Sequence, residues 1–429
     1  MSNFKTFTIL MMALLIFSAC SDDDGATPTP SSSATFRVQI ENILPATSFL
    51  ASGTTNFLAP GESQSISFHA GKGTYLSFAT MFVQSNDLFY AFDETGYPLY
   101  DDNGAAQTGD VTNAVDLWDA GTEVNEEPGV GPNQAPRQSG PNTGADENGT
   151  IQIVNDGFTY PTDEDVIRVT LAHDGGTEFT LTLENISATS TLPSPLAPGV
   201  WVVHGPEVQL FSTGQPSDAG LEGIAEDGDN SITEASLTAG TGYTSPLAPG
   251  VWAVHDQGIY PIFTDGVQDN GNGLEALAED GDPAGLNTSI TGLDGVSSNG
   301  VFNTPEGASA AGPLLPGNSY SFTVDAEEGD YLSLATMLVH TNDLFYGFGQ
   351  EGIPLFNNGT AVEGDVTNFI LLWDAGTEVS EYPGAGNYQP ARGGGNSGPA
   401  ENGIVRTVDD GFTYPIVSNS IRVTVQVMN

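Results

Sequence analysis

The chain has 429 residues, enough for two or three domains with cores of their own. Its 53 glycines and 27 prolines, with 38% hydrophobic residues, favour short strands joined by many turns over long helices. Eight Lys and Arg stand against 55 Asp and Glu, a formal net charge of -47, so the chain lacks the clustered cations that nucleic-acid phosphates require. The acidic excess itself is consistent with solubility as well as with cation binding, so each acidic cluster is judged separately.

The first twenty residues have the pattern of a secretory signal. Lys5 precedes an apolar run from Phe7 to Phe17, which is too short to span a bilayer stably. The following Ser-Ala-Cys resembles a bacterial lipobox, and Cys20, the only cysteine, stands where cleavage would leave it first. We therefore predict a lipoprotein signal peptide over 1–20 and lipidation of Cys20, whose acyl chains would anchor the protein to a membrane. The alternative is a free thiol buried in a helix.

Residues 21–34 (SDDDGATPTPSSSA) have no apolar periodicity and predict a flexible linker. Acidic residues directly after a lipidated cysteine resemble the surface-export signals of some Gram-negative lipoproteins. We therefore expect an exported chain that is lipid-anchored at the outer membrane and faces outward. No cysteine follows Cys20, so disulfides do not stabilise the rest of the chain.

The chain then repeats itself, which indicates duplication. The segments that open the two copies, FRVQIENI at Phe36 and FTLTLENI at Phe179, alternate apolar and polar residues as half-buried strands do. We predict a first repeat over 35–174 and a second over 178–429. Two longer segments carry the duplication: LSFATMFVQSNDLFYAF (76–92) recurs as LSLATMLVHTNDLFYGF (332–348), and GDVTNAVDLWDAGTEVNEEPG (109–129) recurs as GDVTNFILLWDAGTEVSEYPG (364–384).

The second repeat carries an insertion over 194–300 that is itself doubled. SPLAPGVWVVH at Ser194 and SPLAPGVWAVH at Ser245 each precede a short helical pattern, DAGLEGIAEDGD and NGNGLEALAEDGD, which ends at Gly228 or Gly281. Helices of this length are not stable alone and have to pack on a sheet. The first repeat lacks such a module, and one possibility is that the spare copy covers it.

The sequence contains no Gly-x-Ser-x-Gly elbow, no Gly-rich phosphate loop, no His-Glu-x-x-His and no cysteine nucleophile in its body. Among 55 acids, a pair suited to glycosidase chemistry is always available, so such a pair carries no information. We therefore expect that the protein is not an enzyme.

A repeated acidic loop stands out from the general acidity. Asp-Ala-Gly-Thr-Glu follows a hydrophobic strand in both copies, and a further Asp ends an apolar segment upstream. Small residues between two carboxylates allow a sharp turn that brings both toward one point, as calcium requires with its six to eight oxygen ligands. The residues alone equally allow acids that shape turns by accepting hydrogen bonds from their own backbone. The candidates are Asp87, Asp119 and Glu123 in the first repeat, and Asp343, Asp374 and Glu378 in the second.

The segments SNDLFY, LWDAGTE, GLEALAEDGDP, FNTPEGA and IRVT resemble the spondin-domain family of extracellular-matrix proteins. The resemblance covers 179–428 and, without the helical module, 36–172. It implies an all-β fold of two tandem antiparallel β-sandwich domains, similar to calcium-binding membrane-associated sandwiches, with short helices inserted in the second. It also implies that the two acidic triads bind calcium at one edge of each sandwich. The loop ends in Glu where animal members of the family usually have Asp.

These patterns predict a cell-surface lipoprotein that binds a glycan, a matrix polymer or another protein, and that contacts the membrane only through its lipid anchor. The alternatives are a secreted hydrolase or polysaccharide-processing accessory subunit, and a purely structural envelope lipoprotein. Four aromatic residues that follow the acidic segments would serve either as ligand contacts or as sandwich core: Tyr90, Phe92, Tyr346 and Phe348.

Overall fold

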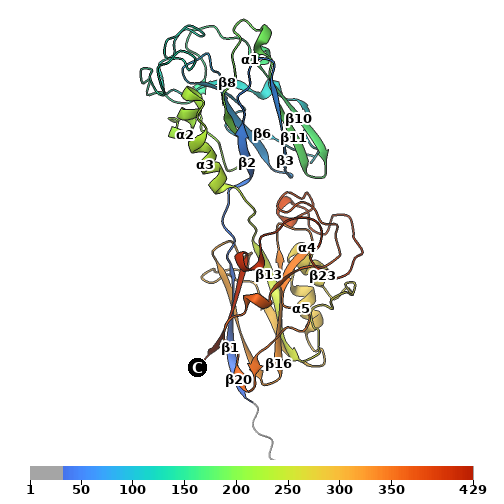
Figure 1. The fold of residues 1–429 in the computed structure, drawn as a ribbon. Coiled ribbons are helices and arrows are strands. Elements are labelled where there is room, and N and C mark those ends of the chain that lie inside the picture. The colour runs from blue at the N-terminus through green and yellow to red at the C-terminus, as the bar shows by residue number, and fades with distance from the viewer. Residues whose placement is uncertain (1–31, 429) are drawn as a thin grey trace, which may run out of the picture.

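The computed structural model describes residues 32–428, which form two antiparallel β-sandwich units with short helices packed on each (Figure 1). This confirms the predicted all-β sandwich class. The predicted signal peptide, Cys20 and nearly all of the linker lie outside the described residues. Within 32–428, no helix has the length and apolar character needed to cross a membrane.

The first unit is built from one continuous stretch of chain, residues 49–241. One sheet has the order β2-β12-β4-β5-β8-β9, with β6 paired to β4, and the facing sheet has the order β3-β11-β10-β7. Its strands are β2 (Phe49–Thr55), β3 (Ser63–His69), β4 (Tyr75–Met81), β5 (Leu88–Ala91), β6 (Tyr97–Pro98), β7 (Gly109–Asp110), β8 (Asp116–Asp119), β9 (Gln152–Ile153), β10 (Ile167–Gly175), β11 (Glu178–Asn185) and β12 (Gly199–His204).

The second unit combines the first strand of the chain with residues from 243 onward. One sheet has the order β14-β13-β16-β17-β22-β23, with β18 paired to β16, and the facing sheet has the order β15-β1-β24-β21. Its strands are β1 (Ser33–Asn42), β13 (Leu247–Asp256), β14 (Val296–Phe302), β15 (Ser319–Glu327), β16 (Asp330–Leu338), β17 (Leu344–Gly347), β18 (Ile353–Pro354), β19 (Phe356–Asn357), β20 (Thr360–Ala361), β21 (Gly364–Asp365), β22 (Leu371–Asp374), β23 (Arg406–Thr407) and β24 (Ile421–Met428).

The predicted repeat boundaries, 35–174 and 178–429, assign β1 to the first unit and β11 to the second. The structure places each of these two opening strands in the other unit. β1 pairs with β15 and β24 of the second unit, whereas β11 pairs with β3 and β10 of the first. The reason for the β11 pairing is local. Gly175 and Gly176, with φ of 113° and 55°, turn β10 directly into β11, so the two form a tight antiparallel hairpin.

As a result, the first unit is a circular permutation of the second, inserted between β1 and β13. In the second unit the opening strand comes first, whereas in the first unit its counterpart β11 comes after the closing strand β10. The expected alternation holds in both strands: Phe36, Val38 and Ile40 are fully buried in β1. Intervening residues of β1 are partly exposed, as a half-buried strand requires.

The helices are divided between the units and do not all belong to the second repeat. In the first unit, Leu221 and Ile224 pack with Trp118 in one core cluster, while Leu277 packs with Trp373 in the second. The spare helical module thus covers the first sandwich, and left-handed Gly228 and Gly281 end the helical segments as predicted. The helices are α1 (Asp163–Val166), α2 (Ala219–Glu222), the π-helical turn η3 (Gly223–Asp227), α3 (Ser231–Gly240), α4 (Leu274–Asp280) and α5 (Ala284–Ile290).

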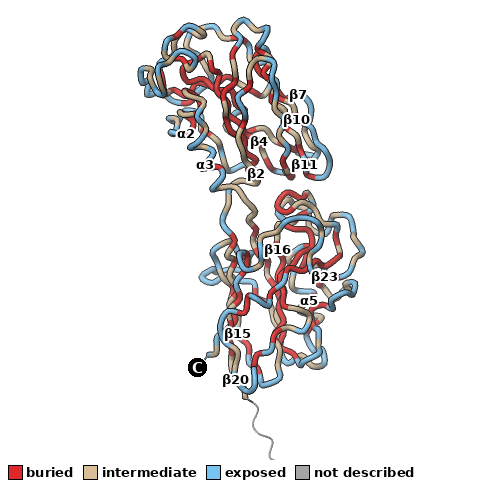
Figure 2. Tube along the Cα trace, viewed as in Figure 1, coloured by how far each residue is buried: buried red, intermediate tan, exposed pale blue. Residues whose placement is uncertain are grey.

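Within residues 32–428, five short 3-10 turns complete the connections: η1 (Thr112–Ala114), η2 (Ser187–Thr189), η4 (Thr367–Phe369), η5 (Pro390–Arg392) and η6 (Val417–Asn419). Buried residues follow the facing sheets of each unit, with exposed loops around them (Figure 2). Tyr90, Phe92, Tyr346 and Phe348 are all at most 2% exposed, so they belong to the sandwich cores and are not surface contacts.

The two units touch through the end of β3 and the segment that follows it. Arg392 of the second unit donates from Nη1 to the carbonyl of Lys72 (2.8 Å) and from Nη2 to the carbonyl of Gly384. The amide of Lys72 donates to Asn387 Oδ1 at 2.9 Å, and His69 stacks on Tyr382 with ring centroids 3.7 Å apart. One arginine therefore links backbone groups of both units.

Candidate metal centre

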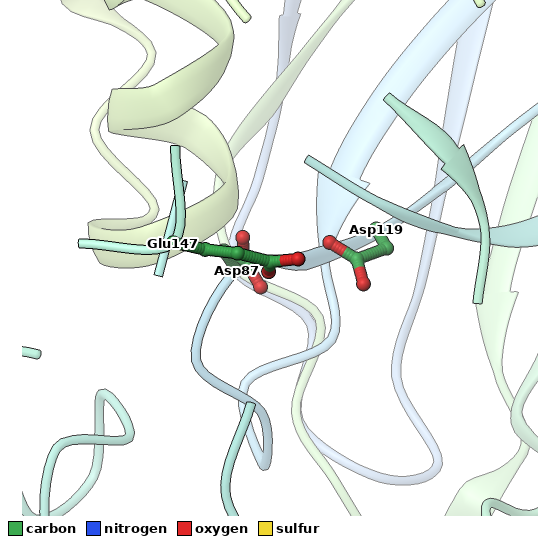
Figure 3. A group of neighbouring side chains, drawn as sticks. All are labelled: Asp87, Asp119 and Glu147. Carbon is green, nitrogen blue, oxygen red and sulfur yellow. The ribbon is translucent and has the colours of Figure 1, made fainter. Parts of the chain in front are cut away.

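Strand register brings the first acidic triad together. Asp87 directly precedes β5, and Leu88 lies opposite Asp119, the last residue of β8. On the other side of β8, Asp119 lies opposite Gln152 of β9, whose preceding loop carries Glu147. Carboxylate oxygens of Asp87, Asp119 and Glu147 all lie within 4.8 Å of one another (Figure 3). The end of β8 and the segments just before β5 and β9 thus supply one carboxylate each.

Asp87 is the buried centre of this triad. It is fully buried, and its Oδ2 accepts from the Thr122 amide (2.7 Å), the Thr122 hydroxyl (3.2 Å) and the Glu123 amide (3.0 Å). Its Oδ1 is buried and has no hydrogen-bond partner. Burial, and then the charge of Asp119, raise the pKa of Asp87 to about 7. A buried polar oxygen without a partner is costly, and a cation would satisfy it.

Asp119 is 2% exposed and held by two donors, the Gly121 amide to Oδ1 (2.8 Å) and Asn125 Nδ2 to Oδ2 (2.9 Å). Burial raises its pKa. Glu147 is the exposed member, and its pKa is raised by partial burial and then by the charge of Asp119. The left-handed Gly121 (φ 70°) lets the loop turn back over the site, where a Cβ would clash with the backbone of Thr150 at 2.6 Å.

The second unit repeats this arrangement with Asp343, Asp374 and Glu401, whose oxygens also lie within 4.8 Å of one another. Asp343 is fully buried, and its Oδ2 accepts from the Thr377 amide (2.8 Å), while its Oδ1 lacks a partner. Burial, followed by the charge of Asp374, raises the pKa of Asp343 to about 7. The duplication of an orphaned buried oxygen among three carboxylates indicates a built site and not chance acidity.

The structure brings four of the six predicted ligands into these triads and places the other two beside them. Glu123 is 2% exposed and accepts from Asn86 Nδ2 (3.2 Å) and the Gly144 amide (2.6 Å). Glu378 likewise accepts from Asn342 Nδ2 (2.9 Å) and the Gly398 amide. Both glutamates therefore fasten the long loops 120–151 and 375–405 over the site.

One more buried acid extends each cluster from the helical module. Glu226 of η3 is 3% exposed and hydrogen-bonded to Thr122, and burial raises its pKa to about 7, with the charge of Glu123 contributing. Glu279 of α4 has the same place beside Thr377 and Glu378, and its pKa is likewise raised by burial to about 7. Glu226 therefore lies beside the first triad, and Glu279 lies beside the second.

Sequence reasoning missed Glu147, Glu401, Glu226 and Glu279, although each lies in a duplicated segment. Glu147 and Glu401 both begin Glu-Asn-Gly, and Glu226 and Glu279 both lie in Ala-Glu-Asp-Gly-Asp. The donor set, three carboxylates with facing oxygens up to 4.8 Å apart, fits a hard cation with oxygen ligands at about 2.3 to 2.6 Å.

No family model matches the sequence, and the search of curated proteins returned no significant match. The spondin resemblance therefore rests on the quoted motifs alone.

Proposed function

We propose that the protein is a calcium-dependent binding protein of the cell surface, built from two spondin-like sandwiches. The observation that carries the calcium proposal is the buried, unpartnered Oδ1 of Asp87, repeated at Asp343, each of which belongs to a triad of neighbouring carboxylates. Bound Ca²⁺ would give this oxygen a partner and would counter the burial and the neighbouring negative charge that raise the pKa of both aspartates.

The long loops over the sites support a binding role. Residues 120–151 connect two neighbouring strands that a short turn could join, and loops of this length in compact domains are usually functional. Their inner side is fastened to the acidic cluster through Glu123, whereas Val124 and Val130 are 48% and 67% exposed on the outside. Calcium would hold this loop rigid, so that an outward-facing ligand, a glycan, matrix polymer or protein, would meet an ordered surface.

The position of β1 fits display from a membrane anchor. β1 begins at the end of the second unit that is far from the first unit (Figure 1). A lipid attached through a linker before β1 would therefore place the first unit outermost. Two similar loop surfaces on one chain would raise avidity for a repetitive target.

The test is thermal unfolding of the full chain in calcium and in chelator, with a glycan and matrix-protein array read under both conditions. We expect calcium to raise the unfolding midpoint and to increase binding on the array. In the double variant Asp119→Ala and Asp374→Ala, the calcium-induced shift should disappear. A midpoint that does not respond to calcium in the wild-type chain would contradict the calcium proposal, and array binding that ignores calcium would contradict the binding role.

A further inference from the structure

The two triads differ at one position that strand register makes equivalent. Gln152 of β9 lies opposite Asp119, and Arg406 of β23 lies opposite Asp374. Both residues come five positions after the third acid of their triad, Glu147 or Glu401. The first site therefore has a neutral amide where the second has a guanidinium, which remains protonated at any physiological pH.

Arg406 reaches into the second triad. Its Nη2 lies 2.7 Å from Asp374 Oδ2 and 2.8 Å from Glu401 Oε1, so it is held between two of the three carboxylates. The contact with Asp374 is an ion pair without the alignment of a hydrogen bond, whereas the contact with Glu401 is a hydrogen bond as well. In this unit, two of the three carboxylates that would bind a calcium ion are already paired with the guanidinium of Arg406.

The first triad has no such counter-ion. Asp119 Oδ2 accepts from the neutral amide of Asn125 at 2.9 Å, and the second repeat has Ser380 at that position. Among the described residues, no Lys or Arg forms an ion pair with Asp87, Asp119 or Glu147. The three carboxylates of the first site thus face one another with only neutral donors.

A guanidinium within a few ångströms of a divalent ion opposes its binding in two ways. It repels the ion, an effect that is large even at an effective dielectric constant well above that of a dry interior. It also has to leave carboxylates with which it is already paired. Together these effects predict a second site that is weaker than the first by about tenfold or more.

We propose that the two sites are inequivalent, with calcium bound by Asp87, Asp119 and Glu147 in the first unit and with Arg406 acting as a built-in counter-ion in the second. The second unit is then stable without calcium, whereas the first unit, the outermost one, responds to it. This inference rests on the proposed function, because it concerns which of two calcium sites is used.

Isothermal titration of the full chain with CaCl₂, in magnesium-containing buffer of physiological ionic strength, tests it. Wild type should show one tight site, Arg406→Gln two, and Gln152→Arg none. Arg422→Gln is the matched control, because it removes an exposed arginine of the same unit that pairs with Glu41 (3.2 Å) away from the triad. Hydrogen exchange on the same samples should show calcium protection in β5 and β8 of wild type, and additionally in β17 and β22 of Arg406→Gln.

Two equal tight sites in wild type, or one unchanged site in both Arg406→Gln and Gln152→Arg, would overturn the inference while leaving the calcium proposal intact. Absence of any tight site in wild type, Arg422→Gln and Arg406→Gln would overturn the calcium proposal and this inference with it. If Arg406→Gln fails to fold, Gln152→Arg decides the matter alone: the wild-type site should weaken by about tenfold or more, and an unaltered site would overturn the inference.

Discussion

Replacing Asp87 with Asn should have opposite effects in the absence and presence of calcium. The carboxyl of Asp87 is fully buried, and burial and the charge of Asp119 raise its pKa from 3.8 to about 7. A group whose pKa is raised in the folded state contributes stability below pH 4 that is lost as the pH rises to about 7. At pH 8 without calcium, the folded protein therefore carries a buried charge that costs about 4 kcal/mol at most.

Asp87→Asn removes this charge, and its side-chain oxygen can still accept from the Thr122 and Glu123 amides. In chelator at pH 8, we expect the first unit to gain about 2–4 kcal/mol, which corresponds to a midpoint about 5–15 °C higher for a unit of this size. In chelator at pH 5, the gain should shrink, because wild-type Asp87 is then largely protonated. In calcium at a hundred times its Kd, wild type should gain about 2.7 kcal/mol and the variant none.

Scanning calorimetry gives the midpoints, and hydrogen exchange of β4 and β12 assigns them to the first unit. Asp102→Asn is the matched control, since it makes the same charge change at an exposed position. A variant that is less stable than wild type in chelator at pH 8 would contradict the cost of the buried charge, and one that calcium stabilises as much as wild type would contradict the role of Asp87 as a ligand.

Glu147→Gln should weaken calcium binding about tenfold in isothermal titration. Glu123→Gln should mainly lower the stability of the first unit by about 1–3 kcal/mol, because it gives up the charge-assisted hydrogen bonds that fasten the loop. Equal calcium affinities of these two variants would contradict the assignment of Glu147 to the triad. Ile40→Ala should lower the free energy of unfolding of the second unit by about 2–4 kcal/mol, and Leu183→Ala should lower that of the first unit by the same amount, as measured by hydrogen exchange. Destabilisation of the opposite unit by either variant would contradict the strand pairing. Arg392→Ala should leave the free energy of unfolding of each unit within about 1 kcal/mol of wild type, yet widen the distribution of distances between the units in small-angle scattering. An unchanged distribution would contradict the linking role of Arg392.

The sequence predicts much of this fold because the patterns it uses are local. The alternation in β1 and β11 depends only on a buried face, and the glycine stops of the helical segments depend only on their own backbone. The partners of β1 and β11 could not be predicted from alternation, since two duplicated strands fit either unit equally well. The turn at Gly175 and Gly176 was the available evidence, because it favours pairing of β11 with β10 over a break between domains.

The site was predicted in part for the same reason. Asp119 and the glycine turn after it form one short motif, so Asp119 and its loop could be recognised in the sequence. Glu147 joins Asp119 only through the pairing of β8 with β9, across a loop that no spacing rule specifies. Glu123, which the motif suggested as a ligand, turns inward to Asn86 and Gly144. Arg406 gave no sign in the sequence, because its importance depends on strand register.

The most direct test of the calcium site is a crystal structure of the full chain grown in calcium, with anomalous data to identify the ion. We expect an ion in the first unit, bound at about 2.3 to 2.6 Å by Asp87 Oδ1 and by carboxylate oxygens of Asp119 and Glu147. An ordered first unit in which these three carboxylates hold no ion at saturating calcium would contradict it.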